Sequence, residues 1–144
     1  MARHPTKDKG DIGVGFVIAD LFQHGVQVAL PISEHLPFDC IGISSEGILK
    51  RVSIKYRKAR QGRLEVRLRS SWADKHGTHT RFHANNDYDV VAIYCPDHQS
   101  CYYVRTSEVS GNTIVLRVEP AKNNQQAGIT DAAGFRDPNR MFEF

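Results

Sequence analysis

A stripe of apolar residues at helical spacing follows the polar first nine residues of the chain. The repeat consists of Ile12, Phe16, Ala19 and Phe22, and it is widened by Val14, Val17, Ile18 and Leu21. This period is typical of one face of an α-helix, so we predict a helix over residues 10–24 that ends at Gly25 in a left-handed conformation. The breadth of the stripe indicates that the helix lies on a sheet. Gly13 and Gly15 lower helix propensity and indicate close packing against another element.

Beyond this helix, short segments with alternating or continuous apolar residues predict strands. The predicted strands are residues 26–30, 38–44, 48–57, 63–70, 87–95, 101–105 and 112–118. The polar residues 71–86 are expected to form a long loop, and residues 130–135 a short helical turn. A helix followed by a largely antiparallel run of strands predicts one α/β domain over residues 1–144. Its mixed, mainly antiparallel sheet would have the N-terminal helix packed on it.

The predicted strands 38–44 and 48–57 are separated by the tight turn Ser45–Glu46–Gly47. A hairpin with this turn places Asp39 on one strand beside Lys55 on the next. A carboxylate can hold a divalent cation, and a neighbouring ammonium can face a phosphate or a metal-bound water. These are the minimum groups for metal-assisted phosphodiester hydrolysis.

The length and composition are those of one globular domain. The chain has 144 residues, of which 40% are hydrophobic and 24% charged, and no apolar run is long enough to span a bilayer. The N-terminus lacks the apolar core of a signal peptide, so we expect no export and no membrane partner. Cys40, Cys95 and Cys101 show no CxxC spacing and are expected to be reduced, buried thiols of a cytoplasmic protein.

The net charge is only +3, but the basic residues are unevenly distributed. Nine of the nineteen lysines and arginines fall between residues 50 and 69, where Glu65 is the only acid. Basic density of this kind attracts nucleic acid, because each neutralised phosphate releases counterions. The alternative is a solvated, charged face. Our candidate DNA contacts are Arg57, Lys58, Arg60, Arg67 and Arg69 from this stretch, and Trp72, Lys75, His76 and Thr78 from the loop that follows.

Three histidines, His76, His79 and His83, cluster in the predicted loop. They raise the possibility of a zinc site, but their spacing matches no standard zinc finger. DNA contact and plain solvent exposure are the other two interpretations. The sequence contains no glycine-rich phosphate loop, nucleophile elbow or dinucleotide-binding fingerprint.

Several short segments, taken in order, resemble those of a known family. They are Lys9–Gly13 at the start of the helix, Pro37–Asp39, Val52–Lys55, Ile93–Pro96 and Leu116–Pro120. Together they resemble the PD-(D/E)XK (restriction-endonuclease-like) nuclease superfamily, and within it the small homing endonucleases encoded by bacterial group I introns. The resemblance covers nearly the whole chain and depends on the order and spacing of the segments.

This resemblance implies roles for four groups. Asp39 would bind Mg²⁺ (or Mn²⁺), the backbone carbonyl of Ile54 would coordinate the same ion, Ser53 would complete its shell, and Lys55 would orient or activate the attacking water. Members of the family bend double-stranded DNA and cut both strands as dimers or tetramers, so a homodimer or homotetramer is implied. DNA as substrate implies a cytoplasmic, nucleoid-associated protein.

The sequence departs from the family pattern in two places. Ser53 stands where Glu, Asp or Gln is usual, and Val14 stands where the first helix often carries an acid. Asp11 or Asp20 could substitute for that acid in another helix register. We therefore expect a Mg²⁺-dependent, sequence-specific DNA endonuclease of homing type. The alternatives are a catalytically degenerate DNA-binding relative and a nuclease resembling Holliday junction resolvases.

Overall fold

A five-stranded sheet forms the centre of the protein in the computed structural model, which describes residues 2–82, 87–120 and 130–143. The strand order is β1-β2-β3-β7-β8. These strands are β1 (Gln27–Ala29), β2 (Cys40–Ile43), β3 (Leu49–Tyr56), β7 (Val90–Cys95) and β8 (Ser100–Arg105). Neighbouring strands are antiparallel except β3 and β7, which are parallel. The prediction of a mixed, mainly antiparallel sheet is confirmed.

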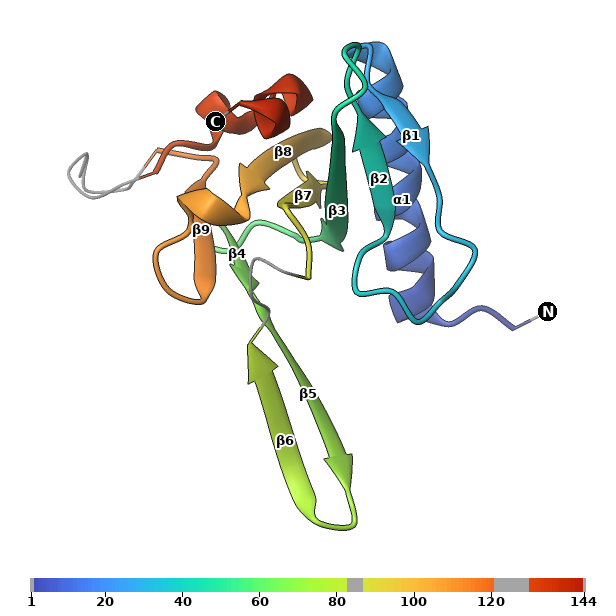
Figure 1. Ribbon diagram of the computed structural model, residues 1–144. Coiled ribbons are helices and arrows are strands. Elements are labelled where there is room, and N and C mark those ends of the chain that lie inside the picture. Colours follow the sequence, from blue (N-terminus) through green and yellow to red (C-terminus); the bar gives the residue numbers. More distant parts are fainter. Residues whose placement is uncertain (1, 83–86, 121–129, 144) are drawn as a thin grey trace.

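One face of this sheet is covered by α1 (Pro5–Gln23) (Figure 1). The helix begins five residues before the predicted start, with Pro5 in the first turn, where its fixed φ favours helix. It ends as predicted before Gly25, which has a φ of 77°. Together with the helix-facing side chains of β3, β7 and β8, it encloses a core in which Val17, Leu21, Val52 and Tyr103 are buried.

The face of α1 that packs on the sheet is not the one predicted. Its buried residues are Gly13, Val17 and Leu21, spaced four apart, whereas Ile12 and Phe16 are 45% and 48% exposed. The physical reason is Gly13: a Cβ built there would lie 3.5 Å from the Cβ of Tyr56. The helix approaches β3 most closely along this line. Gly15, in contrast, faces open space.

The opposite face of the sheet is covered by a second, two-stranded antiparallel sheet of β4 (Arg63–Arg67) and β9 (Thr113–Arg117). The inward side chains of these strands include Leu64, Val66 and Leu116, which join a second core with Val91 and Ile93 of β7. Every residue of β7 is buried. The predicted central position of this strand is therefore confirmed, since it has a core on each side.

A hairpin of β5 (Arg69–Asp74) and β6 (Gly77–Phe82) replaces most of the loop predicted over residues 71–86 and extends from the body (Figure 1). The loop prediction is wrong up to Phe82, and the last four residues lie outside the described chain. Neither strand pairs with another sheet. The hairpin therefore does not need the alternating apolar residues by which a strand was recognised in the sequence. The predicted strand 63–70 divides at Leu68, and Arg69 thus belongs to the hairpin, not to the face that carries Arg63 and Arg67.

The 3₁₀ helix η1 (Thr106–Glu108) directly follows β8, and two later 3₁₀ helices, η2 (Ala132–Phe135) and η3 (Pro138–Phe142), pack against β8. The helical turn expected over residues 130–135 is confirmed as η2. Glu108 holds η3 in place, because its carboxylate pairs with Arg140 at 2.6 Å and with Arg105 at 3.1 Å. Arg140 also donates to the carbonyl of Tyr103 at 2.6 Å. All three cysteines are buried free thiols, as predicted.

We expect the Glu108 cluster to make stability dependent on acid pH. Burial raises the pKa of Glu108, but hydrogen bonds from Arg140 and Arg105 outweigh it and lower the pKa to about 2. Because the folded pKa lies below the unfolded value, the stabilisation is complete above pH 4.5 and is lost as the pH falls towards 2. Glu108→Gln should lower the free energy of unfolding at pH 7 by about 1–2 kcal/mol, since solvent screens part of the interaction.

This prediction is checked by thermal melts of the native protein, Glu108→Gln and Glu34→Gln between pH 7 and 3. Glu34 is an exposed acid in the β1–β2 loop and serves as the matched control. The difference in melting temperature between native and Glu108→Gln should narrow as the pH falls. A constant difference over this range would contradict the assignment.

Candidate active site and nucleic-acid interface

The carboxylate of Asp39 lies beside β3 at the predicted position. Asp39 directly precedes β2, and its backbone N–H donates to the carbonyl of Val52 at 2.9 Å. Its Oδ2 accepts a hydrogen bond from the backbone N–H of Ile54 at 2.6 Å. This bond fixes the carboxylate next to the residue that separates Ser53 from Lys55. The predicted hairpin therefore brings the acid and the lysine together.

Ser53 and Lys55 project from the face of the sheet that is opposite to α1. Val52 and Ile54 belong to the helix-side core, and side chains alternate along a strand. Ser53 is only 4% exposed. Lys55 is half-buried, and its pKa is lowered by burial and by repulsion from Arg57, against the attraction of Asp39. Its ammonium forms no ion pair within the described chain, so a half-buried cation faces this site without a direct protein counter-charge.

The oxygen donors at this site are those that a hard cation such as Mg²⁺ prefers. They are the Asp39 carboxylate, the Ser53 hydroxyl and the backbone carbonyl of Ile54. The N–H and C=O of a strand residue point to the same edge, so the Ile54 carbonyl faces the edge occupied by the carboxylate. The described residues contain no group of three or more His, Cys, Asp or Glu that could hold a metal. Mg²⁺ is often held by one or two protein carboxylates together with substrate phosphates. This donor set fits the ion with the smaller of these two numbers, one carboxylate.

The first helix supplies no second carboxylate to this site. Val14 is part-buried and packs against the helix-side core. Asp20 accepts a hydrogen bond from the hydroxyl of Tyr103 at 2.7 Å, which holds it against β8, two strands away from β3. Asp11 is exposed, and its side chain forms no hydrogen bond or ion pair with another described residue. The shifted helix register considered in the sequence analysis therefore does not restore the missing acid.

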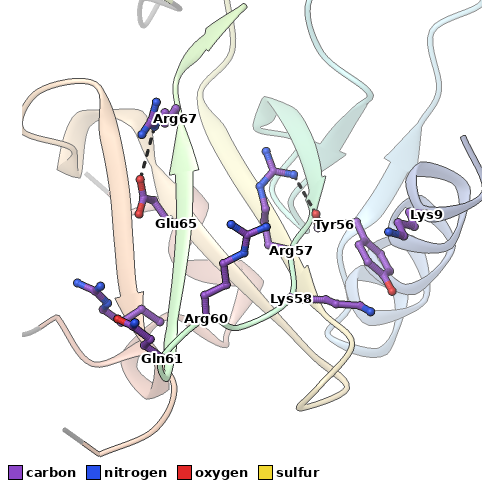
Figure 2. A pocket seen from close by; sticks show the side chains of 9 residues that line it. Lys9, Tyr56, Arg57, Lys58, Arg60, Gln61, Glu65 and Arg67 are labelled. Carbon is purple, nitrogen blue, oxygen red and sulfur yellow. Dashed lines mark hydrogen bonds and ion pairs between the residues drawn. The ribbon is translucent and has the colours of Figure 1, made fainter. Parts of the chain in front are cut away.

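A basic cleft of about 840 Å³ opens between the end of β3, the following segment and β4 (Figure 2). It is lined by Lys9, Tyr56, Arg57, Lys58, Arg60, Gln61, Arg63, Glu65 and Arg67. Six of these side chains are basic and one is acidic. The acid, Glu65, pairs with Arg67 at 3.5 Å, and both side chains are more than half exposed, so this pair is weak. The cleft therefore presents a strong positive potential.

Four of the predicted DNA contacts lie in this cleft: Arg57, Lys58, Arg60 and Arg67. The sequence analysis did not select Lys9, Arg63 or the polar Tyr56 and Gln61. Lys9 lies four residues before Gly13 on the helix face that meets the end of β3. Counting one helical repeat back from Gly13, where the helix comes closest to the sheet, could have identified Lys9.

The segment between β3 and β4 is fixed to the body through two backbone N–H groups. The backbone N–H of Arg57 donates to the carbonyl of Tyr94 at 2.9 Å, which continues the pairing with β7. The N–H of Ala59 donates to the carboxylate of Asp97 at 2.7 Å. The basic side chains of the cleft are thus carried by an ordered backbone, which lowers the entropic cost of binding a polyanion.

The remaining predicted contacts lie on the hairpin. Arg69 and Trp72 are in β5, Thr78 is in β6, and Lys75 and His76 are exposed in the turn between the two strands. Asp74 organises this turn, because its Oδ1 accepts from the His76 N–H at 2.7 Å and lies 3.0 Å from Nε2 of His79. The ring of His79 is thus in contact with Asp74. His83, the third histidine of the cluster, lies outside the described residues. The zinc interpretation gains no support from the described part of the cluster.

Comparison with known proteins identifies the family. The PD-(D/E)XK endonuclease family model matches residues 4–138, so the chain belongs to that family and the predicted resemblance is confirmed. Family membership implies DNA as the substrate class, and these nucleases typically use a divalent metal ion. A solved structure of a bacterial homing endonuclease, I-Ssp6803I, matches with a TM-score of 0.75 and 23% identity. The match covers 96% of this chain and 93% of that chain and shows a common fold.

No curated protein matches the chain. Within the described residues, no helix is both long enough and apolar enough to cross a membrane.

Proposed function

We propose that the protein is a Mg²⁺-dependent, sequence-specific endonuclease of homing type that cuts double-stranded DNA. The observation that carries the proposal is the Asp39 carboxylate held on β3 at Ile54, next to Lys55, whose neighbour in charge, Arg57, lines a basic cleft. The homing type is supported by the fold shared with a bacterial homing endonuclease over nearly the whole chain. Insertion of a group I intron at the cut site is the biological role that this type implies.

In this proposal Asp39 and the Ile54 carbonyl would hold the metal ion, and Ser53 would complete its shell. The ion supplies a Lewis acid for the phosphate and lowers the pKa of a bound water. Lys55 orients the attacking water and stabilises negative charge that develops at phosphorus. No ion pair with a described residue engages the ammonium, which is therefore available for this task.

The cleft and the hairpin would hold the duplex on either side of the reacting phosphate. Lysine and arginine contacts to phosphates set the position of the protein, and contacts to base edges select the sequence. A two-stranded ribbon fits the major groove, so we assign sequence reading to the β5–β6 hairpin and backbone binding to the cleft.

One chain offers one active site for the two strands of a duplex, so we propose that the protein works as a homodimer or homotetramer. The exposed side of α1 supports self-association, since Ile12 and Phe22 are each about half exposed. Apolar side chains gathered on one helix face are typical of protein interfaces. A chromosomal target would bring the assembly to the nucleoid.

The proposal is tested by incubating the native protein with a plasmid library that carries a randomised insert, in Mg²⁺, in Mn²⁺ and in EDTA. Sequencing of the cut ends should show a restricted set of sites in either metal and none in EDTA. Cutting without sequence preference would contradict the homing type. Cutting of branched DNA in preference to the linear duplex would indicate a junction resolvase.

A second candidate function is a DNA-binding relative without catalysis, which is favoured by the presence of Ser53 and Val14 in place of two acids. Tight, salt-sensitive binding with no cut ends in either metal would identify it.

The hairpin assignment makes a separate prediction for Lys75. Lys75→Gln should weaken DNA binding several-fold at 0.1 M salt and reduce the slope of log Kd against log salt by about 0.9, the value for one phosphate contact. Arg136→Gln is the matched control, because Arg136 is an exposed cation between η2 and η3, at the far end of the molecule from the hairpin (Figure 1). Equal Kd values and equal salt slopes for native protein and Lys75→Gln would contradict a contact between the hairpin turn and DNA.

A further inference from the structure

Asp39 and Lys55 form what we call the acid–lysine site. Arg57 is the cation that connects the basic cleft to this site. It follows β3 directly and continues the β3–β7 pairing through its N–H, so it lies two positions beyond Lys55 on the same face of the strand. Arg57 is half-buried, whereas the other cleft cations, Lys9, Lys58, Arg60, Arg63 and Arg67, are exposed. It is the innermost positive group of the cleft.

The electrostatic surroundings of Arg57 favour an anion. Its guanidinium donates to the carbonyl of Tyr56 at 2.9 Å (Figure 2) and pairs with no carboxylate in the described chain. Burial lowers the pKa of Arg57, and its charge lowers the pKa of Lys55. Two half-buried cations that repel each other are unfavourable in the free protein. A bound phosphate removes this repulsion and supplies the missing counter-charge.

We propose that Arg57 is a further catalytic residue, which contacts the scissile phosphate beside Lys55 and supplies positive charge to an active site that offers a single carboxylate to a metal ion. This inference rests on the proposed nuclease function. Arginine suits the role because its planar fork can bond two phosphate oxygens at once. The Tyr56 carbonyl orients the fork.

The step concerned is hydrolysis of a phosphodiester. The oxygen of water forms a bond to phosphorus and its proton passes to solvent, while the bond from phosphorus to one sugar oxygen breaks and that oxygen takes up a proton. Negative charge grows on the phosphate oxygens before the leaving bond breaks. A guanidinium fixed at these oxygens stabilises the transition state more than the ground state, so its loss lowers the rate more than the affinity.

The test measures two quantities for one duplex that carries a cleavage site: the single-turnover rate of cleavage at saturating protein, and the Kd. The proteins compared are the native protein, Arg57→Gln, Arg57→Lys and Lys50→Gln. Lys50 lies at the other end of β3 and provides a matched loss of one charge. We expect Arg57→Gln to lower the saturating rate about 10²- to 10³-fold and the affinity less than about tenfold. Arg57→Lys keeps the charge without the fork and should fall between Arg57→Gln and the native protein. Lys50→Gln should match the native protein.

The outcomes separate this inference from the proposed function. Cutting by the native protein and by both Arg57 variants at rates within threefold would overturn the role of Arg57 and leave the nuclease assignment intact. A loss confined to Kd would make Arg57 an ordinary backbone contact and also overturn the inference. Absence of cutting by the native protein in Mg²⁺ and Mn²⁺ would overturn the proposed function and this inference with it. Melting curves identify a misfolded Arg57→Gln, in which case Arg57→Lys decides.

Discussion

Replacing Lys55 with methionine should lower the single-turnover rate of DNA cleavage by about a thousandfold or more, a barrier increase of about 4 kcal/mol. Lys55 is the lysine of β3 that feels the charge of Asp39, and no carboxylate among the described residues pairs with it directly. Methionine retains the length of the side chain and removes the charge. Affinity for DNA should change less than tenfold, since one of many cationic contacts is lost.

The stability of Lys55→Met provides an internal check. Burial lowers the pKa of Lys55, which means that the charged form is disfavoured in the folded protein. The melting temperature of Lys55→Met should therefore equal or exceed that of the native protein. Lys50→Met, on the same strand, should cut at the native rate. A Lys55→Met protein that cuts within tenfold of the native rate would rule out Lys55 as a catalytic residue.

Replacing Asp39 with asparagine should have an effect of similar size for a different reason. The amide oxygen can still accept the hydrogen bond from Ile54, so the start of β2 should keep its geometry. The charge that holds the metal ion is lost, and the described chain has no second carboxylate at the site to compensate. We expect the cleavage rate in Mg²⁺ to fall at least about 10³-fold.

DNA binding in EDTA distinguishes this charge effect from misfolding. Without metal, the Asp39 carboxylate repels the phosphate backbone, so Asp39→Asn should bind DNA as tightly as the native protein or a few-fold more tightly. Glu46→Gln is the control, because Glu46 is an exposed acid at the turn of the same β2–β3 hairpin. Cleavage by Asp39→Asn at a rate close to that of the native protein would exclude Asp39 as the metal ligand.

The acid–lysine site could be predicted because it depends on local structure. A three-residue turn between two short apolar segments fixes the β2–β3 pairing, and that pairing alone brings Asp39 to Ile54. The central position of β7 was also predictable, because a strand with a core on each face has a continuous apolar sequence.

The predictions that were wrong concern contacts that the local pattern of apolar and polar residues does not determine. The apolar stripe of α1 is broad enough to allow several faces, and the close approach at Gly13 selects the one that runs through Val17 and Leu21. Ile12 and Phe16 remain half exposed as a result. The β5–β6 hairpin was missed because its strands pair only with each other and need no apolar side to cover a core. Lys9 joins the cleft through the packing of α1 on β3, and a basic stretch in the sequence could not indicate this.

The measurement that tests the central claim most directly is single-turnover cleavage of one site recovered from the randomised library, in Mg²⁺, by the native protein, Lys55→Met and Asp39→Asn, with DNA binding measured in parallel. We predict that all three proteins bind the site and that only the native protein cuts it at a measurable rate. Cutting by either variant at the native rate, or binding without cutting by the native protein, would contradict the assignment of Asp39 and Lys55 as the centre of an active nuclease.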